Sequence, residues 1–252
     1  MSRTAPSSAP PGWLTRVAGS VTANTALVLT ALTGGLLVSA LTASGAEVYD
    51  AVAEQDGVAR LDRPVLDQMI AWRTPLTSRL VTGFTNLGGL VGMTIIASAI
   101  TLLMVWRWRS RTPLILMIIA AAGSLSFTTV GKAIVGRPRP PLADAVPPYE
   151  YAFSFPSGHA LNSTVIAGMV AYLVARRLRS RWTRALPAAA AVAWSVAMGL
   201  SRVFLGHHWL TDVIFAWLLG LAWLALLITA HRIFLAVSAV RTPEPVPRRR
   251  RR

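Results

Sequence analysis

Two stretches of the chain decide how the rest of it is arranged: Ser154-Phe-Pro-Ser-Gly-His159 and Ser201-Arg-Val-Phe-Leu-Gly-His-His208-Trp-Leu-Thr-Asp212. A third piece precedes them, in which six residues separate Lys132 from Arg139-Pro140. Each piece lies at or near the end of a strongly apolar run. Charged side chains beside a lipid bilayer are rare and usually functional. The three pieces therefore predict one functional site, and the apolar runs predict the scaffold that assembles it.

The apolar runs predict a membrane protein. The chain has 252 residues, of which 54% are apolar, and a transmembrane helix needs roughly 20 mostly apolar residues. We therefore expect an all-α, polytopic bundle of six transmembrane helices over 21–235, with its motif core at 132–212. Residues 1–20 are expected to form a disordered cytoplasmic tail, and 236–252 a basic one. The predicted spans are 21–43, 80–106, 113–135, 160–175, 187–200 and 213–234.

Two features of the first two apolar runs bear on how the helices are placed. The first run could be a signal peptide, although its apolar core exceeds the roughly 7–15 residues typical of one. The second run contains Gly88 and Gly92, a spacing that lets helices approach closely in membranes.

The polar stretch 47–79 holds six acids and four arginines. Its apolar residues recur at roughly helical spacing, which predicts an amphipathic helix on the membrane surface; a plain connecting loop is the alternative. These apolar residues are Leu61, Val65, Leu66, Met69, Ile70 and Trp72, and the charged residues between them are Asp62, Arg63, Asp67 and Arg73.

The distribution of charge predicts the orientation in the membrane. The net charge of +15 comes from 25 basic and 10 acidic residues. With six spans and a cytoplasmic N-terminus, the inner segments hold 17 of the 25 basic residues and one acid, Glu244. This is the positive-inside pattern, so the basic composition requires no nucleic-acid partner. Both termini are then cytoplasmic and the three motif pieces lie on the outer face. The absence of cysteine excludes disulfides and thiolate chemistry.

The motif residues are suited to chemistry on an anion. His208 and Asp212 are four residues apart, so a helix would bring them to one face. A carboxylate there holds one ring nitrogen and leaves the other free to attack. One alternative is that His159 joins this pair as a metal ligand, and another is that Arg202 simply pairs with Asp212. Three cations around the site favour phosphate over a metal: Lys132, Arg139 and Arg202.

The tetrapeptide Pro156-Ser157-Gly158-His159 predicts the start of a helix. Ser157 is the expected cap, and free backbone N–H groups at a helix start bind anions. His159 would lie in the first turn, close to a bound anion.

The order and spacing of these motifs resemble the type 2 phosphatidic acid phosphatase superfamily. The match comprises Lys132-x6-Arg139-Pro140, Pro156-Ser-Gly-His159 and Ser201-Arg202-x5-His208-x3-Asp212. The resemblance implies that His208 is the nucleophile that forms a phosphohistidine, that Asp212 orients it and that His159 protonates the leaving lipid oxygen. It implies no metal or other cofactor. It also implies that the phosphoryl oxygens are held by Lys132, Arg139, Arg202, Ser157 and the backbone N–H of Gly158.

Two further residues fall in the last motif. Ser201 matches it, whereas His207 occupies a position that varies within the superfamily, so we expect His207 to be a bystander. Ala216 stands where many members have glycine, which concerns helix packing alone.

The resemblance leads to an expected function. We expect a phosphatase that acts on a lipid phosphomonoester or diphosphate at the outer leaflet of a bacterial cell membrane. Undecaprenyl diphosphate is the favoured substrate, with phosphatidic acid and phosphatidylglycerophosphate as alternatives. A non-enzymatic binder or transporter of lipids or anions is the alternative from another class, and the complete set of acid, nucleophile and orienting carboxylate argues against it.

Overall fold

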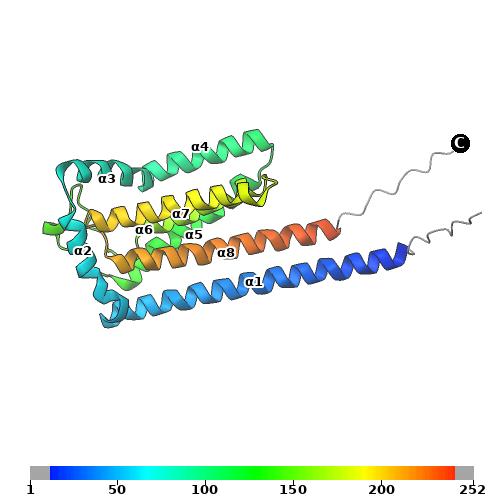
Figure 1. The fold of residues 1–252 in the computed structure, drawn as a ribbon, viewed down its shortest axis with the longest axis horizontal. Coiled ribbons are helices and arrows are strands. Elements are labelled where there is room, and N and C mark those ends of the chain that lie inside the picture. Colours follow the sequence, from blue (N-terminus) through cyan, green and yellow to red (C-terminus); the bar gives the residue numbers. More distant parts are fainter. Residues whose placement is uncertain (1–11, 242–252) are drawn as a thin grey trace, which may run out of the picture.

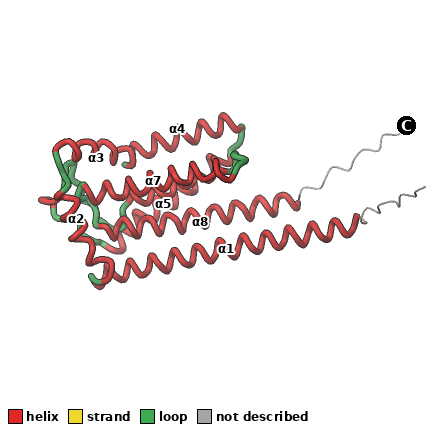
Figure 2. The backbone as a smooth tube through the Cα atoms, in the orientation of Figure 1, coloured by secondary structure: helices red, strands yellow, loops and turns green. Residues whose placement is uncertain are grey.

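The structure is a computed structural model that describes residues 12–241, and every regular element in that range is helical (Figure 2). Six of its helices are long and apolar enough to cross a membrane, so the all-α, six-span prediction is confirmed. The helices are α1 (Gly12–Glu54), α2 (Asp62–Ala71), α3 (Pro75–Gly88), α4 (Leu90–Trp108), α5 (Thr112–Val135), α6 (Gly158–Ala175), α7 (Arg181–Phe204) and α8 (Leu210–Arg241), and two short 3-10 turns are η1 (Gly57–Leu61) and η2 (Leu142–Asp144).

Helix α1 begins earlier than predicted. The segment 12–20, which the sequence analysis assigned to a disordered tail, forms the first turns of this helix. The rest of that tail, 1–11, and the end of the basic tail, 242–252, lie outside the described residues. Helix α1 runs beside α8 (Figure 1), and Gly34 allows the close approach, because a Cβ there would lie 2.1 Å from Thr229 Oγ1.

The predicted second span, 80–106, is wrong as a single helix. It divides into α3 and α4 at Gly89, whose backbone is extended with φ −68° and ψ 169°. Two consecutive glycines favour a break because glycine has a low helix propensity. The predicted packing role holds for Gly88, where a Cβ would lie 2.3 Å from Met198 Sδ of α7. Gly92 instead faces the backbone of Asn86 across the break.

An amphipathic helix, as predicted within 47–79, is present as α2. Leu66 is fully buried, while Val65 and Met69 pack against a small apolar cluster formed by α6, α7 and α8. Arg63 and Asp67, two of the charged residues between the apolar positions, form an exposed ion pair. Asp62 does not face outward, however: it is 5% exposed and points into the protein.

The alternating direction of the helices brings three connecting segments to one end of the bundle. These are the segment with η1 and α2, the loop 136–157 between α5 and α6, and the turn 205–209 between α7 and α8 (Figure 1). Helices α1 and α8 carry the two ends of the described chain to the opposite end.

Two apolar clusters support this arrangement. The larger one joins α4, α5, α6 and α8 around Met93, Met117 and Met169. The smaller one, directly below the connecting segments, consists of Ala160, Leu161, Val203, Val213 and Ala216. Large apolar side chains cover the outside, such as Leu36 at 71% and Ile134 at 75% exposure, as expected for a surface that faces lipid.

Candidate active site

The predicted histidine and carboxylate meet, although by a different route from the one expected. Helix α8 begins at Leu210, so His208 lies in the turn before the helix and not on a shared helical face. The turn nevertheless brings His208 Nδ1 to 3.3 Å from Asp212 Oδ2. Asp212 Oδ2 also accepts a hydrogen bond of 2.9 Å from the backbone N–H of Trp209, which fixes the turn against the first turn of the helix.

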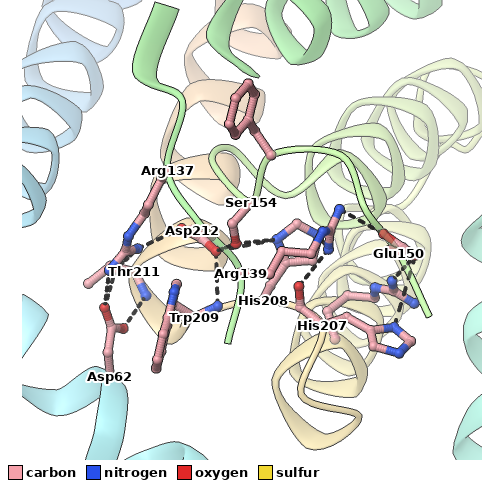
Figure 3. A network of polar contacts seen from close by, with 12 residues as sticks. Asp62, Arg137, Arg139, Glu150, Ser154, His207, His208, Trp209, Thr211 and Asp212 are labelled. Atoms are coloured by element: carbon pink, nitrogen blue, oxygen red, sulfur yellow. Dashed lines mark hydrogen bonds and ion pairs between the residues drawn. The ribbon is translucent and has the colours of Figure 1, made fainter. Parts of the chain in front are cut away.

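Asp212 is fully buried and has a partner on each oxygen (Figure 3). Arg137 Nη1 lies 2.6 Å from Asp212 Oδ1, and the hydroxyl of Ser154 donates to Oδ2. A buried carboxylate is tolerated only when such charged and polar partners compensate for lost hydration. The carboxylate is therefore held in one position against the imidazole.

The hydrogen bonds of His208 define its tautomer. Arg139 Nη1 lies 3.2 Å from His208 Nε2, and a guanidinium can only donate. Nε2 therefore carries the lone pair, and Nδ1 carries the proton that faces Asp212. Burial, with the charges of Arg139 and Arg202, holds the pKa of His208 well below its usual value. At neutral pH the imidazole is uncharged, with a nucleophilic nitrogen directed toward the arginines.

The arginines hold a carboxylate that belongs to the protein itself. Glu150 lies on the loop 136–157, with Oε2 2.8 Å from Arg139 Nη2 and Oε1 in an ion pair with Arg202 (Figure 3). Although burial opposes ionisation, Arg202 and Arg139 lower the pKa of Glu150 to about 2. The two predicted phosphate-binding arginines thus form an anion cradle, here occupied by a side-chain anion. The alternative in which Arg202 pairs with Asp212 is wrong.

The remaining predicted anion ligands surround this cradle. Lys132, in the last turn of α5, donates to the carbonyl of Phe153. Ser157 is the residue before α6, as predicted, but its side chain makes no capping bond, and its hydroxyl is buried without a partner in the described structure. Arg202 Nε is also buried and unpaired. Unpaired buried donors are rare and call for an explanation.

His159 lies in the first turn of α6, as predicted, and faces the break between α3 and α4. A Cβ added at Gly89 would lie 3.4 Å from His159 Nε2. The charged groups that act on the imidazole are Arg202, Glu150, His207 and Arg139, which places it beside the cradle. Among the described residues, the imidazole has no hydrogen-bond partner, so it is available to a ligand.

His207, which we expect to be a bystander in the reaction, makes two contacts that join segments of the site. Its Nε2 donates to the carbonyl of Val146 over 2.7 Å, and its Nδ1 lies 4.0 Å from Glu150 Oε1. His207 therefore links two segments of the site: the turn 205–209, which contains His208, and the loop 136–157, which contains Glu150. Ser201 is buried below the cradle, where its hydroxyl contacts Thr85 Oγ1 over 3.1 Å, and Arg202 donates to the same oxygen over 3.0 Å.

A chain of charges behind the site was not predicted from the sequence. Arg137 also lies 2.7 Å from Asp62 Oδ2, and Asp62 in turn accepts bonds from the N–H and hydroxyl of Thr211 over 2.9 and 2.7 Å. Helix α2 thereby anchors the residue that pairs with Asp212. The available signal was weak: Arg137 lies two residues before Arg139, and Asp62 is one of several charged residues in an amphipathic pattern.

These features define an integral membrane protein in which a neutral imidazole, held by a carboxylate, faces an arginine-lined anion cradle. Comparison with known proteins identifies the family to which the chain belongs. The chain belongs to the PAP2 superfamily, whose model matches residues 111–234. Phosphatidylglycerophosphatase B of Bacillus subtilis (strain 168) is 30% identical over 179 residues, covering 69% of this chain and 85% of that protein.

Solved structures share the fold. The crystal structure of a transmembrane PAP2-type phosphatidylglycerolphosphate phosphatase from Bacillus subtilis has a TM-score of 0.65 and 24% identity, covering 82% of this chain and 96% of its own. That of Aquifex aeolicus LpxE has a TM-score of 0.50 and 19% identity, covering 71% and 95%. The protein is therefore a multi-pass membrane lipid phosphatase of this superfamily.

Proposed function

We propose that this phosphatase removes the terminal phosphate of a membrane lipid through a phosphohistidine on His208. The observation that carries the proposal is the arrangement of His208, whose Nε2 lone pair points at Arg139 while Asp212 holds Nδ1. An uncharged imidazole fixed in this tautomer is an activated nucleophile. Arg139 and Arg202 provide the positive charge that phosphoryl transfer needs.

The reaction proceeds in two steps. His208 Nε2 attacks phosphorus while the bond from phosphorus to the lipid oxygen breaks, and His159 donates its proton to that oxygen. Asp212 stabilises the imidazolium character that develops on His208. Water then attacks the phosphohistidine, His159 takes the proton from the water, and inorganic phosphate leaves. Lys132, the hydroxyl of Ser157 and the N–H of Gly158 hold the phosphoryl oxygens, and the unpaired donors on Ser157 and Arg202 gain partners from them.

A lipid substrate also needs space for its chains. A cavity of about 330 Å³ runs between α4, α5 and α6, starting at Leu90, next to the glycine that faces His159. Its walls are mostly apolar, including Met93, Ala97 and Ile166, with Asn162 one turn after His159. Such a cavity suits an acyl or prenyl chain whose headgroup lies in the cradle. The excess of arginine at the opposite end of the bundle supports an active site on the extracytoplasmic face.

Phosphatidylglycerophosphate is the substrate we propose first, because the relative from Bacillus subtilis is named phosphatidylglycerophosphatase B. Undecaprenyl diphosphate, favoured from the sequence, and phosphatidic acid also present a terminal phosphate and stay as predictions. The proposed test measures phosphate release from these three lipids by purified protein in detergent, with His208→Ala as the matched control. Release by wild type and none by His208→Ala is expected. Equal release by both proteins would exclude His208 as the nucleophile, and none from any lipid would contradict the proposed function.

A further inference from the structure

We propose that Glu150 determines specificity by competing with the substrate for Arg139 and Arg202, so that the cradle accepts phosphates with two or more negative charges and rejects phosphodiesters. The proposal rests on the proposed function, because it takes this cradle as the place where the substrate phosphate binds. Glu150 lies outside the three sequence motifs, and its contacts in the folded loop carry the proposal.

The contacts of Glu150 are those of a bound anion. Its two oxygens divide between the two arginines, with 2.8 Å from Oε2 to Arg139 and an ion pair from Oε1 to Arg202. Arg202 is 1% exposed, so its charge depends on a neighbouring anion for compensation. Arg139 also touches His208 Nε2, so the carboxylate and an attacked phosphorus need the same place. A phosphate therefore has to displace Glu150 from at least one arginine.

The loop allows this displacement. The segment between Val146 and Ser154 is fastened at its start, where Val146 N bonds to Leu205 O over 2.9 Å. It is fastened again over its last three residues, where Ser154 N bonds to Arg137 O over 2.8 Å and the carbonyls of Ala152 and Phe153 accept bonds from Arg139 and Lys132. No backbone bond of this kind holds residues 147–151 within the described structure, and side chains there face outward, with Tyr149 at 45% and Tyr151 at 82% exposure. The Glu150 side chain itself is 33% exposed. It can therefore move toward solvent while the helices stay in place.

The exchange of anions then depends on charge. A phosphodiester carries one negative charge, so replacing the carboxylate with it leaves the electrostatic attraction to the arginines almost unchanged. A phosphomonoester or terminal diphosphate carries about two charges near pH 8, so it gains attraction when it takes the place of one carboxylate charge. The common glycerophospholipids of a bilayer are phosphodiesters at far higher concentration than any lipid monoester. Glu150 thus keeps the abundant lipids from blocking the site.

Two small anions test this selection without a lipid chain: methyl phosphate, a monoester, and dimethyl phosphate, a diester. Binding of each at pH 8 is measured from the rise in unfolding temperature of the detergent-solubilised full-length protein, and independently from inhibition of p-nitrophenyl phosphate turnover. For wild type, methyl phosphate should bind at least ten times more tightly. In Glu150→Gln the affinity for dimethyl phosphate should rise about ten- to hundredfold, the usual worth of a charged hydrogen bond, and the ratio between the two anions should shrink.

Asp144→Asn is the matched control, because it removes the same charge from the same loop. Asp144 pairs with Arg63, at the surface, and its variant should keep the wild-type ratio. Equal binding of the two anions by wild type would overturn the proposal even if no variant folds. An unchanged ratio in a folded Glu150→Gln protein would also overturn it. Absence of turnover in wild type would instead contradict the proposed function, since the binding measurement still tests Glu150.

Discussion

Arg137 is the cation between two buried carboxylates, and replacing it should expose how much the site depends on that charge. It lies 2.7 Å from Asp62 and 2.6 Å from Asp212. Arg137→Gln leaves both carboxylates without this cation, and removing one partner of a buried ion pair costs about 3–5 kcal/mol. For a chain of roughly 150–250 residues, 1 kcal/mol shifts the unfolding temperature by about 2–4 °C. The variant should therefore unfold about 6–20 °C below wild type.

A second substitution should restore part of this loss. Asp62→Asn in the Arg137→Gln background removes one of the two uncompensated charges, while the amide oxygen can still accept the bond from Thr211 N. Coupling between residues in contact is about 0.5–3 kcal/mol. The double variant should therefore unfold several degrees above Arg137→Gln. Asp67→Asn, which changes the exposed pair of the same helix α2, should give no such rescue.

The assay is thermal unfolding in detergent followed by the fluorescence of the nine tryptophans, with turnover measured on the same samples. Turnover of Arg137→Gln should also fall, because Asp212 loses the partner that holds it. If the destabilisations of Asp62→Asn and Arg137→Gln simply add in the double variant, the two residues are not coupled. The carboxylate–guanidinium–carboxylate chain would then not be what stabilises Asp212.

Four further outcomes are expected. His208→Ala should abolish acid-labile phosphate on the protein, while His159→Ala should slow release of a lipid alkoxide by roughly 10²–10⁴ but release of p-nitrophenolate much less; equal slowing of both would exclude a general acid. In the folded protein the pKa of Glu150 is about 2, below the ordinary value of about 4.3. The ionised carboxylate therefore contributes its full stabilisation above about pH 4.3, and that stabilisation is lost as the pH falls to about 2. The gap in unfolding temperature between wild type and Glu150→Gln should accordingly narrow only below about pH 4.3, and a gap that closes near pH 6 would assign the effect to another group. Activity should survive EDTA and be inhibited competitively by orthovanadate, whereas loss on chelation with rescue by a divalent metal would restore the metal-ligand alternative. A cysteine in place of Ala143 should react with an impermeant reagent on intact cells and one in place of Ser180 should not; the reverse would place the site on the cytoplasmic face.

The membrane spans were predictable because the hydropathy of a segment depends on its composition alone, and because an apolar segment in a bilayer has few alternatives to a helix. Their ends were less so. The fifth span was predicted to begin at Pro187, but α7 begins at Arg181 and contains Pro187 within it. The charged and polar residues before the proline are also helical. The break at Gly89 follows the low helix propensity of two consecutive glycines. Hydropathy across 80–106 does not register this propensity, because the residues on both sides of the break are apolar.

The residues predicted for the site lie together because each is next to a helix end, where the topology fixes its position. Glu150 lies near the middle of a loop, and its contacts depend on a path that local propensity does not determine. Asp62 is separated by 75 residues from Arg137, a distance in sequence that no helical spacing can relate. The tautomer of His208 likewise follows from the position of Arg139, which only the folded loop supplies.

The contact between Asp62 and Arg137 sets the smallest piece of this protein that can be exchanged with a relative. The region matched by the superfamily model begins at residue 111, yet Asp62 on α2 pairs with Arg137, Thr85 on α3 bonds to Arg202, and Gly89 adjoins His159. A chimaera joined at residue 111 would combine a foreign first half with a site that needs all three. A workable junction lies before α2, between the end of α1 and η1. The exchanged piece then contains Asp62, Thr85 and the break at Gly89 together with the histidines of the site.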